Sequence, residues 1–394
     1  MICCALIVAV LLLLVNGGQA FALDPPSGDE LQRQIDQTLQ EIIEDLDVSS
    51  LQGMLDGMSN VPQEMSQVKQ LIQKIATGQF QYMGADIFAF LVESVKRPIA
   101  NGIFLFSELL LLMIISGILA QLMKSFSTDG AAKIANLIVY SAAAILIVGA
   151  LSSAIKATSA AIDSLLSVSQ SIFPVLSIML ASTGGFASTA VLQPAWSIVL
   201  ETTSWLTREV LIPAALYGGV LVVVGNLTEK NLLSELGGLI RSGSIWVAGA
   251  VMTVFVAIAS IQGNAAISYD GISFRAAKYA VDSMVPYLGG MFSDMADTFV
   301  GCSLLVRNAV GMAGLLVMVI VILEPVLSAV AVYFAFKLAA ALAGSLESKQ
   351  MAAVMGESSK VVMLLLVIML MSFAMLFFMI TITINAGNSI LAMR

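Results

Sequence analysis

The sequence predicts an all-α membrane protein with a signal peptide, an extracytoplasmic amphipathic helical segment and about eight transmembrane helices. Of its 394 residues, 59% are hydrophobic and 11% are charged, whereas a soluble domain has about 45–50% apolar and about 25% charged residues. The mean hydropathy is +0.96. The apolar residues also gather in runs long enough to cross a bilayer. We therefore divide the chain into residues 1–22, 23–98 and 99–394.

The first 22 residues are typical of a secretory signal peptide. Ile2–Val15 is an unbroken apolar run, and Ala20–Ala22 has the small-x-small pattern that precedes cleavage. The alternative is an uncleaved N-terminal anchor, because no Lys or Arg precedes the run. In both cases the segment that follows begins outside the cytoplasm.

Residues 23–98 form the acidic segment. Ser27 and Glu30 have the spacing of a helix capping box. Apolar residues then recur at helical spacing, at Leu31, Ile35, Leu39, Ile42, Ile43 and Leu46. This stripe has two interpretations: it packs within the chain or on the bilayer surface, or it docks a helix of an extracytoplasmic partner.

The body from residue 99 onward contains the spans. Runs of sufficient length lie at about 103–123, 134–155, 172–192, 210–227, 244–263, 299–323, 326–344 and 361–386. With the acidic segment outside, the cytoplasmic loops carry Lys124, Lys133, Arg208, Arg275, Lys278, Lys349 and Lys360. The opposite loops carry Lys156, Lys230, Arg241 and Arg394. This distribution agrees weakly with the positive-inside rule.

The third run is irregular. Pro174 opens it and Gly184-Gly185 interrupts it, and such residues in a span need neighbours that satisfy the freed backbone groups. A broken helix around a permeation path and an ordinary kinked helix both fit this pattern.

Charged residues inside apolar runs are the candidate functional residues, because each costs about 2.5–3.5 kcal/mol at the bilayer centre on insertion scales. They are Glu108, Arg307, Glu324 and Lys337, with Asp294 and Asp297 as interfacial partners. Snorkelling and ion pairing explain them as well as a polar path or a subunit contact does. We expect Arg307 and Lys337 nearer the cytoplasmic side, and Glu108 and Glu324 nearer the outer side.

The composition argues against several function classes. The chain has no histidine, which removes Ser-His-Asp and Cys-His catalysis and histidine-ligated metal sites. Three cysteines, at 3, 4 and 302, are too few for a disulfide scaffold. The formal net charge of −8 disfavours nucleic-acid binding. We expect no enzyme, no catalytic residues, no cofactor and no metal.

One stretch carries a resemblance to a known family. It runs from Ser273-Phe274-Arg275 through Tyr287-Leu288-Gly289-Gly290 to Arg307-Asn308-Ala309-Val310-Gly311. With the signal peptide, acidic segment and multi-span body, it resembles the stage III sporulation protein AE family of endospore-forming bacteria.

The resemblance implies a membrane component of a channel-like, secretion-like complex between mother cell and forespore. Such a component is needed for spore formation and late, sigma-G-dependent forespore gene expression. The implied location is the mother-cell membrane around the forespore. The implied partners are the other stage III A-operon proteins, stage II sporulation protein Q and the lipid bilayer; homo-oligomers are also open. A small-solute permease and a purely structural assembly platform stay open as alternatives.

Overall fold

The computed structural model describes residues 29–56, 67–78, 84–125, 129–227, 232–284, 289–345 and 349–392. The predicted signal peptide, residues 1–22, lies outside the described residues. Every regular element in the described part is helical, so the predicted all-α class is confirmed.

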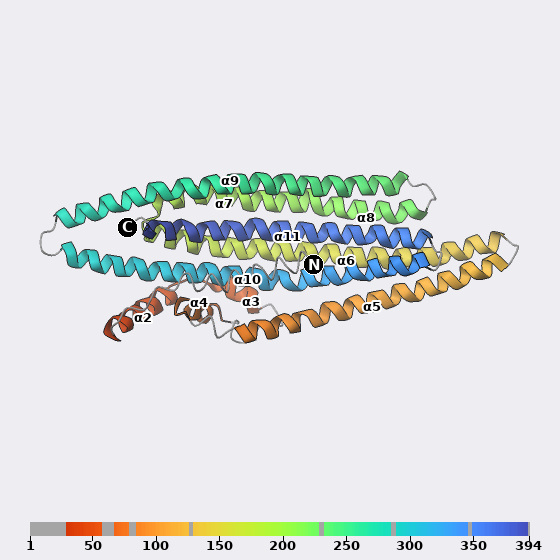
Figure 1. The fold of residues 1–394 in the computed structure, drawn as a ribbon, viewed down its shortest axis with the longest axis horizontal. Coiled ribbons are helices and arrows are strands. Elements are labelled where there is room, and N and C mark those ends of the chain that lie inside the picture. The colour runs from red at the N-terminus through yellow and green to blue at the C-terminus, as the bar shows by residue number, and fades with distance from the viewer. Residues whose placement is uncertain are drawn as a thin grey trace.

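Six long helical elements run up and down side by side (Figure 1). They are α5 (Gly84–Ser125), α6 (Asp129–Ser182), the continuous unit α7 (Phe186–Trp205), η2 (Leu206–Leu211) and α8 (Ile212–Leu227), then α9 (Leu232–Met284), α10 (Gly289–Ser345) and α11 (Lys349–Ala392). We call the end of the bundle with Ser125, Leu227 and Ser345 the Ser125 end, on the right in Figure 1. The opposite end, with Ser182, Met284 and Ala392, is the Ser182 end.

The described residues contain six helices long and apolar enough to cross a membrane, where the sequence predicted eight spans. The predicted sixth and seventh runs join in α10, which continues through Pro325. A proline removes one helix hydrogen bond, and neighbouring helices can compensate for that loss. The predicted third run is divided between α6 and α7 by a turn at Gly184, whose φ of +91° suits glycine.

Helix α10 forms the core of the bundle. All side chains from Val306 to Leu323 are buried, and the helix packs against α11, α5 and α6. Over this stretch the helix is enclosed on every side, which suits its largely apolar sequence. Gly311 and Gly314 allow this, because a methyl group built on either would overlap Ile384 or Ile172.

Three short helices lie against the bundle beside α10 and α6: α2 (Asp29–Glu44), α3 (Ser49–Asp56) and α4 (Val68–Ala76). From the predicted stripe, Leu39 and Ile43 are buried in the same core as the long helices. The part of the stripe from Leu39 to Leu46 therefore packs within the chain, which agrees with the first interpretation, and the side chains of Leu31 and Ile35 lie outside the described residues. The predicted boundary between residues 98 and 99 falls inside α5, which starts at Gly84.

The helices also correct the predicted placement of several charges. Lys156 and Arg208 lie within α6 and η2 rather than in loops. Arg275 and Lys278 lie on α9, which ends at the Ser182 end. The short helices pack against α10 and α6 toward that same end (Figure 1). The sequence predicts opposite sides for Arg275 and Lys278 and for the acidic segment, because it counts residues 172–192 as a separate span. In the structure this run is divided between the end of α6 and the start of α7, so the chain crosses once less before it reaches Arg275.

Candidate functional site

Three polar contacts join α7 and η2 to α11 in the bundle interior, and we call them the polar ladder. The Trp196 indole donates to Thr383 Oγ1 at 3.0 Å, Thr203 Oγ1 donates to Met375 Sδ at 3.9 Å, and the Thr207 and Ser372 hydroxyls are 3.4 Å apart. The six residues keep one antiparallel register over the whole contact. Buried polar side chains that find partners specify how two helices align.

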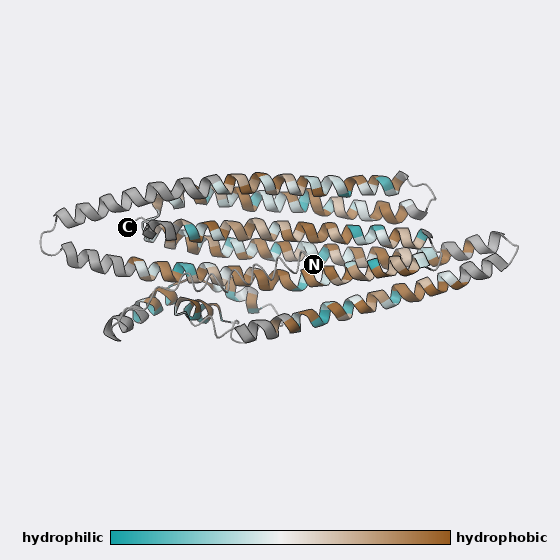
Figure 2. Cartoon of the chain, in the orientation of Figure 1, coloured by the Kyte–Doolittle hydropathy of each residue, from teal (hydrophilic) through white to brown (hydrophobic). Residues whose placement is uncertain are grey.

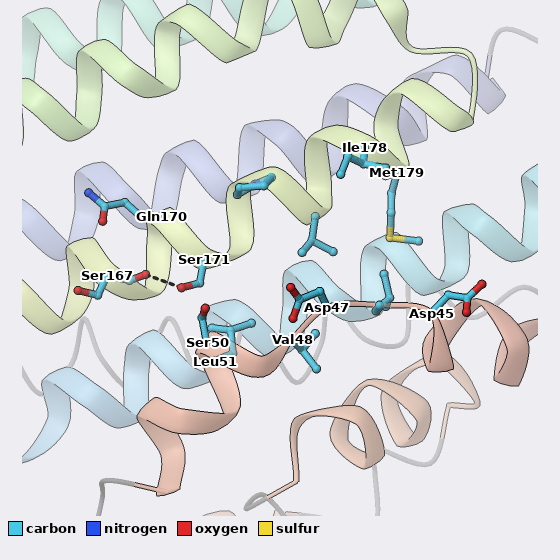
Figure 3. A pocket seen from close by; sticks show the side chains of 13 residues that line it. Asp45, Asp47, Val48, Ser50, Leu51, Ser167, Gln170, Ser171, Ile178 and Met179 are labelled. Atoms are coloured by element: carbon cyan, nitrogen blue, oxygen red, sulfur yellow. Dashed lines mark hydrogen bonds between the residues drawn. The ribbon is translucent and has the colours of Figure 1, made fainter.

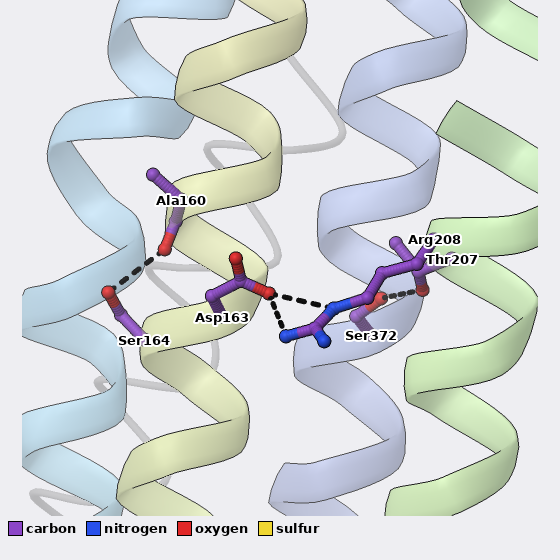
Figure 4. A network of polar contacts seen from close by, with 6 residues as sticks. All are labelled: Ala160, Asp163, Ser164, Thr207, Arg208 and Ser372. Atoms are coloured by element: carbon purple, nitrogen blue, oxygen red, sulfur yellow. Dashed lines mark hydrogen bonds and ion pairs between the residues drawn. The ribbon is translucent and has the colours of Figure 1, made fainter. Parts of the chain in front are cut away.

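A π-helical turn, η2, ends the ladder and directs two consecutive side chains to different partners. Thr207 is buried against Ser372, while exposed Arg208 reaches Asp163 on α6. Both its Nη2 and Nε donate to Asp163 Oδ1, at 2.6 and 3.1 Å (Figure 4). Single π-turns within α-helices are rare and occur often at functional sites.

We predict a small coupling between Asp163 and Arg208, because both side chains are exposed and solvent screens their attraction. A double-mutant cycle with Asp163→Asn and Arg208→Gln should give a coupling of about 0.2–1 kcal/mol in the stability of the purified protein. The matched control combines Arg208→Gln with Glu201→Gln, another exposed acid on α7, and should be additive. Additive behaviour of the first pair would show that this ion pair contributes nothing.

Arg307 lies where α10 meets the Trp196 end of the ladder. Its side chain is 0% exposed, and its Nη2 donates to the Ile384 carbonyl of α11 at 3.1 Å. Ile384 directly follows Thr383 of the ladder. Burial of a guanidinium is costly unless hydrogen bonds compensate for the lost water, so Arg307 stabilises one arrangement of α10 against α11.

A second charged cluster lies nearer the Ser125 end. Arg241 of α9 donates from Nη1 to Glu357 Oε2 of α11 at 2.8 Å, and Lys360 pairs with the other oxygen of the same carboxylate. The Arg241 and Glu357 side chains are mostly buried. This cluster therefore links α9 to α11 without an isolated buried charge.

A cleft of about 680 Å³ opens between the α2–α3 connection and α6 (Figure 3). Asp45 and Asp47 lie on one side, and Ser167, Gln170 and Met179 on the other. The side-chain and backbone hydrogen bonds from Ser49 lower the pKa of Asp47. These bonds favour the ionised carboxylate, so their contribution is lost as the pH falls through the lowered pKa.

The geometry described so far is that of a packed helical membrane bundle, and within the described residues no group of three Cys, Asp or Glu side chains is placed to hold a metal ion. The family model for stage III sporulation protein AE matches residues 66–387. The chain belongs to the stage III sporulation protein AE family. The match begins just before α4 and runs to the last turns of α11, so α2 and α3 lie outside it.

A relative from Bacillus subtilis (strain 168), "Stage III sporulation protein AE", is 30% identical over 308 residues, which cover 78% of this chain and 76% of the relative. No solved structure matches. This family is not known to be catalytic. Membership and the apolar helices together indicate a sporulation protein with multiple membrane spans.

The structure of this AE-family protein does not bring the predicted charged residues together. Arg307 is buried, whereas Glu324 and Lys337 are exposed on the same helix and Glu108 is half-buried on α5. Arg307 lies toward the Ser182 end and Lys337 toward the Ser125 end, so the prediction that both lie near one membrane surface is wrong. The sequence places Arg307 and Lys337 in two separate antiparallel spans, whereas both lie on the continuous helix α10.

The two acidic residues expected to partner these charges, Asp294 and Asp297, lie on the first turns of α10, and their side chains are outside the described residues. The contacts that sequence reasoning missed in this AE-family protein are Asp163–Arg208 and the cluster around Glu357. No sequence signal marks the Asp163–Arg208 and Arg241–Glu357 pairs, because their partners are 45 and 116 residues apart in the chain.

Proposed function

We propose that this protein is a membrane component of the channel-like, secretion-like complex between mother cell and forespore. In this role it supports endospore formation and late, sigma-G-dependent forespore gene expression. Membership of the stage III sporulation protein AE family carries the proposal. The protein lies in the mother-cell membrane around the forespore, with its N-terminal segment outside the mother-cell cytoplasm.

The packing of the bundle favours a component of a multiprotein complex over a permease that consists of this chain alone. Enclosed α10 occupies the place where a single-chain pathway along the bundle axis would run. A conducting path would then form between this chain and its neighbours. Those neighbours are the other stage III A-operon proteins, further copies of this chain and, directly or through them, stage II sporulation protein Q.

A permease of small solutes is the second candidate, and fully buried Arg307 is the observation that favours it. Charges inside membrane proteins often mark substrate paths. The two candidates differ in whether the protein needs partners to act.

Gene deletion in a spore-forming host, with complementation by the full chain, tests the proposal. We expect deletion to cause a loss of heat-resistant spores and of a sigma-G-dependent reporter, with an earlier forespore reporter as the control that stays unchanged. A tagged functional copy should co-purify with other A-operon proteins from sporulating cells. Normal spore numbers after deletion would overturn the sporulation role, and a functional copy that purifies alone would favour the permease.

A further inference from the structure

The helices of this bundle are about twice as long as a membrane is thick. The apolar segments Ile138–Ser182 and Val300–Ser345 contain 45 and 46 residues. At 1.5 Å per residue they extend about 68 Å, against a hydrocarbon core of about 30 Å. Only part of the bundle can therefore lie in the bilayer, and the exposed side chains must distinguish the two parts.

Exposed charges meet at one level near the middle of the bundle. The Asp163–Arg208 ion pair defines this level on α6 and η2. Because Ser372 contacts Thr207, Ser372 marks the same level on α11. Gly314 lies against Ile172 on antiparallel α6. Glu324, ten residues further along α10, is therefore level with residue 162.

The residue of α5 at the same level follows from its contact with α10. Gly102 packs against Ala331 of parallel α10, with 2.8 Å from a built Cβ to the Ala331 Cβ. Lys96, six residues earlier, is therefore level with Pro325. We call exposed Lys96, Asp163, Arg208, Glu209 and Glu324 the polar girdle. The girdle is open at α9, where Val254 and Val256 are the exposed residues.

Between the girdle and the Ser125 end, η2 and α8 together have the length of a bilayer's hydrocarbon core, and α5 and α6 extend further than the other helices (Figure 1). From Arg208 to Leu227 the chain rises about 29 Å. Figure 2 shows apolar residues along the long helices in this half. Among the residues whose side chains the structure describes, most of the exposed large apolar ones lie here, on every long helix: Ile103, Phe104 and Leu111 on α5, Ile145 and Val148 on α6, Val220 and Val224 on α8, Leu239 and Trp246 on α9, Phe334 and Leu338 on α10, and Met363 on α11.

Several charges lie within this half, including exposed Lys156 on α6 and half-buried Glu108 on α5. Lys156 is seven residues from Asp163, about 10 Å along the helix, so its flexible stem can carry the ammonium toward the girdle. Arg241 and Lys360 both pair with the Glu357 carboxylate, which leaves one net positive charge in this cluster. Lys337 is eight residues from the end of α10, about 12 Å, so its flexible stem can carry the ammonium toward the nearer membrane surface. Trp205 is 57% exposed beside the girdle, where amphipathic indole rings favour the membrane–water interface.

We propose that the lipid bilayer surrounds only the half between the polar girdle and the Ser125 end, with one membrane surface at the girdle. The half toward the Ser182 end, with α2–α4 and the cleft beside Asp47, projects as a helical domain into the compartment on that side. This proposal is independent of the sporulation role, since it concerns only where lipid contacts the chain.

Tryptophan quenching in lipid vesicles tests this placement with two matched probes on opposite sides of the girdle. Trp246 is 78% exposed, and the Arg241–Glu357 pair on parallel α9 and α11 places it about 15 Å from Ser372 toward the Ser125 end. Ile198 is 64% exposed and lies nine residues from Thr207, about 14 Å, on the other side.

One full-length variant keeps Trp246 and carries Trp205→Phe; the other carries Ile198→Trp, Trp205→Phe and Trp246→Phe. Both retain Trp196, which is 0% exposed, as a common background. Each is reconstituted in phosphatidylcholine vesicles with bromine deep in the acyl chains, after gel filtration confirms native elution. Phe186→Trp replaces Ile198→Trp if the latter does not fold.

We expect a several-fold greater loss of emission for Trp246 than for the tryptophan at position 198, and the reverse order with aqueous iodide in permeabilised vesicles. In a third variant, Trp246→Phe, Trp205 and Trp196 are the remaining tryptophans. Bromines placed shallow in the acyl chains should quench the Trp205 emission more than bromines placed deep. Equal quenching of the two matched probes by deep bromine, or stronger quenching at position 198, would overturn the proposal and place the hydrocarbon across or beyond the girdle.

Discussion

Replacement of Gly314 by leucine is expected to push α10 away from α6 and to destabilise the whole bundle. A Cβ on Gly314 would lie 3.0 Å from Ile172 Cγ1 and overlap its terminal methyl group. Overpacking a tight core typically costs about 1–3 kcal/mol and sometimes more. The cost should be high here, because small residues are what allow membrane helices to approach closely.

The measurement is the midpoint of thermal unfolding in detergent, with the monodisperse fraction after membrane extraction as a second readout. Gly301→Leu is the matched control: it lies on the same helix, and nothing lies within 4 Å of its built Cβ. Both substitutions gain helix propensity of about 0.8–1 kcal/mol relative to glycine, so this term cancels. Equal midpoints for the two variants would contradict the close packing of α10 against α6.

The fold class followed from the sequence because it depends on composition and run length alone. Uninterrupted apolar runs of about 20 residues with few charges are typical of membrane helices, which satisfy their backbone hydrogen bonds within the segment. The number of spans does not follow from the sequence, because Pro325 predicts a boundary between two runs, whereas α10 continues through it. Whether a proline breaks a helix depends on the neighbours that surround it, and a single sequence does not show them.

The contacts of the candidate site were harder to predict than the helices. Thr203, Thr207 and Ser372 are common residues within apolar runs, and only the register between η2 and α11 makes them partners. Arg307 was found by its charge, yet its full burial and its bond to Ile384 depend on a helix 77 residues away in the sequence. The sequence therefore identifies residues whose burial costs free energy, but not the contacts that compensate for that cost.

Arg307→Met is expected to fold and to fail in spore formation, whereas Arg307→Ala is expected not to accumulate. Truncation to alanine removes a side chain that is 0% exposed, and large-to-small core changes cost about 2–5 kcal/mol. Methionine keeps most of the volume and removes the cost of burying a charge, so this variant should fold.

A folded Arg307→Met variant that fails in spore formation would show that the guanidinium serves function beyond its packing role between α10 and α11. The measurement compares thermal midpoints in detergent with heat-resistant spore counts for the same variants. Lys337→Met is the control, since it removes a positive charge from an exposed position of the same helix and should leave both readouts near wild type. Normal sporulation with Arg307→Met would show that Arg307 serves packing alone, and the polar interior at the Trp196 end of the ladder would then hold no functional charge.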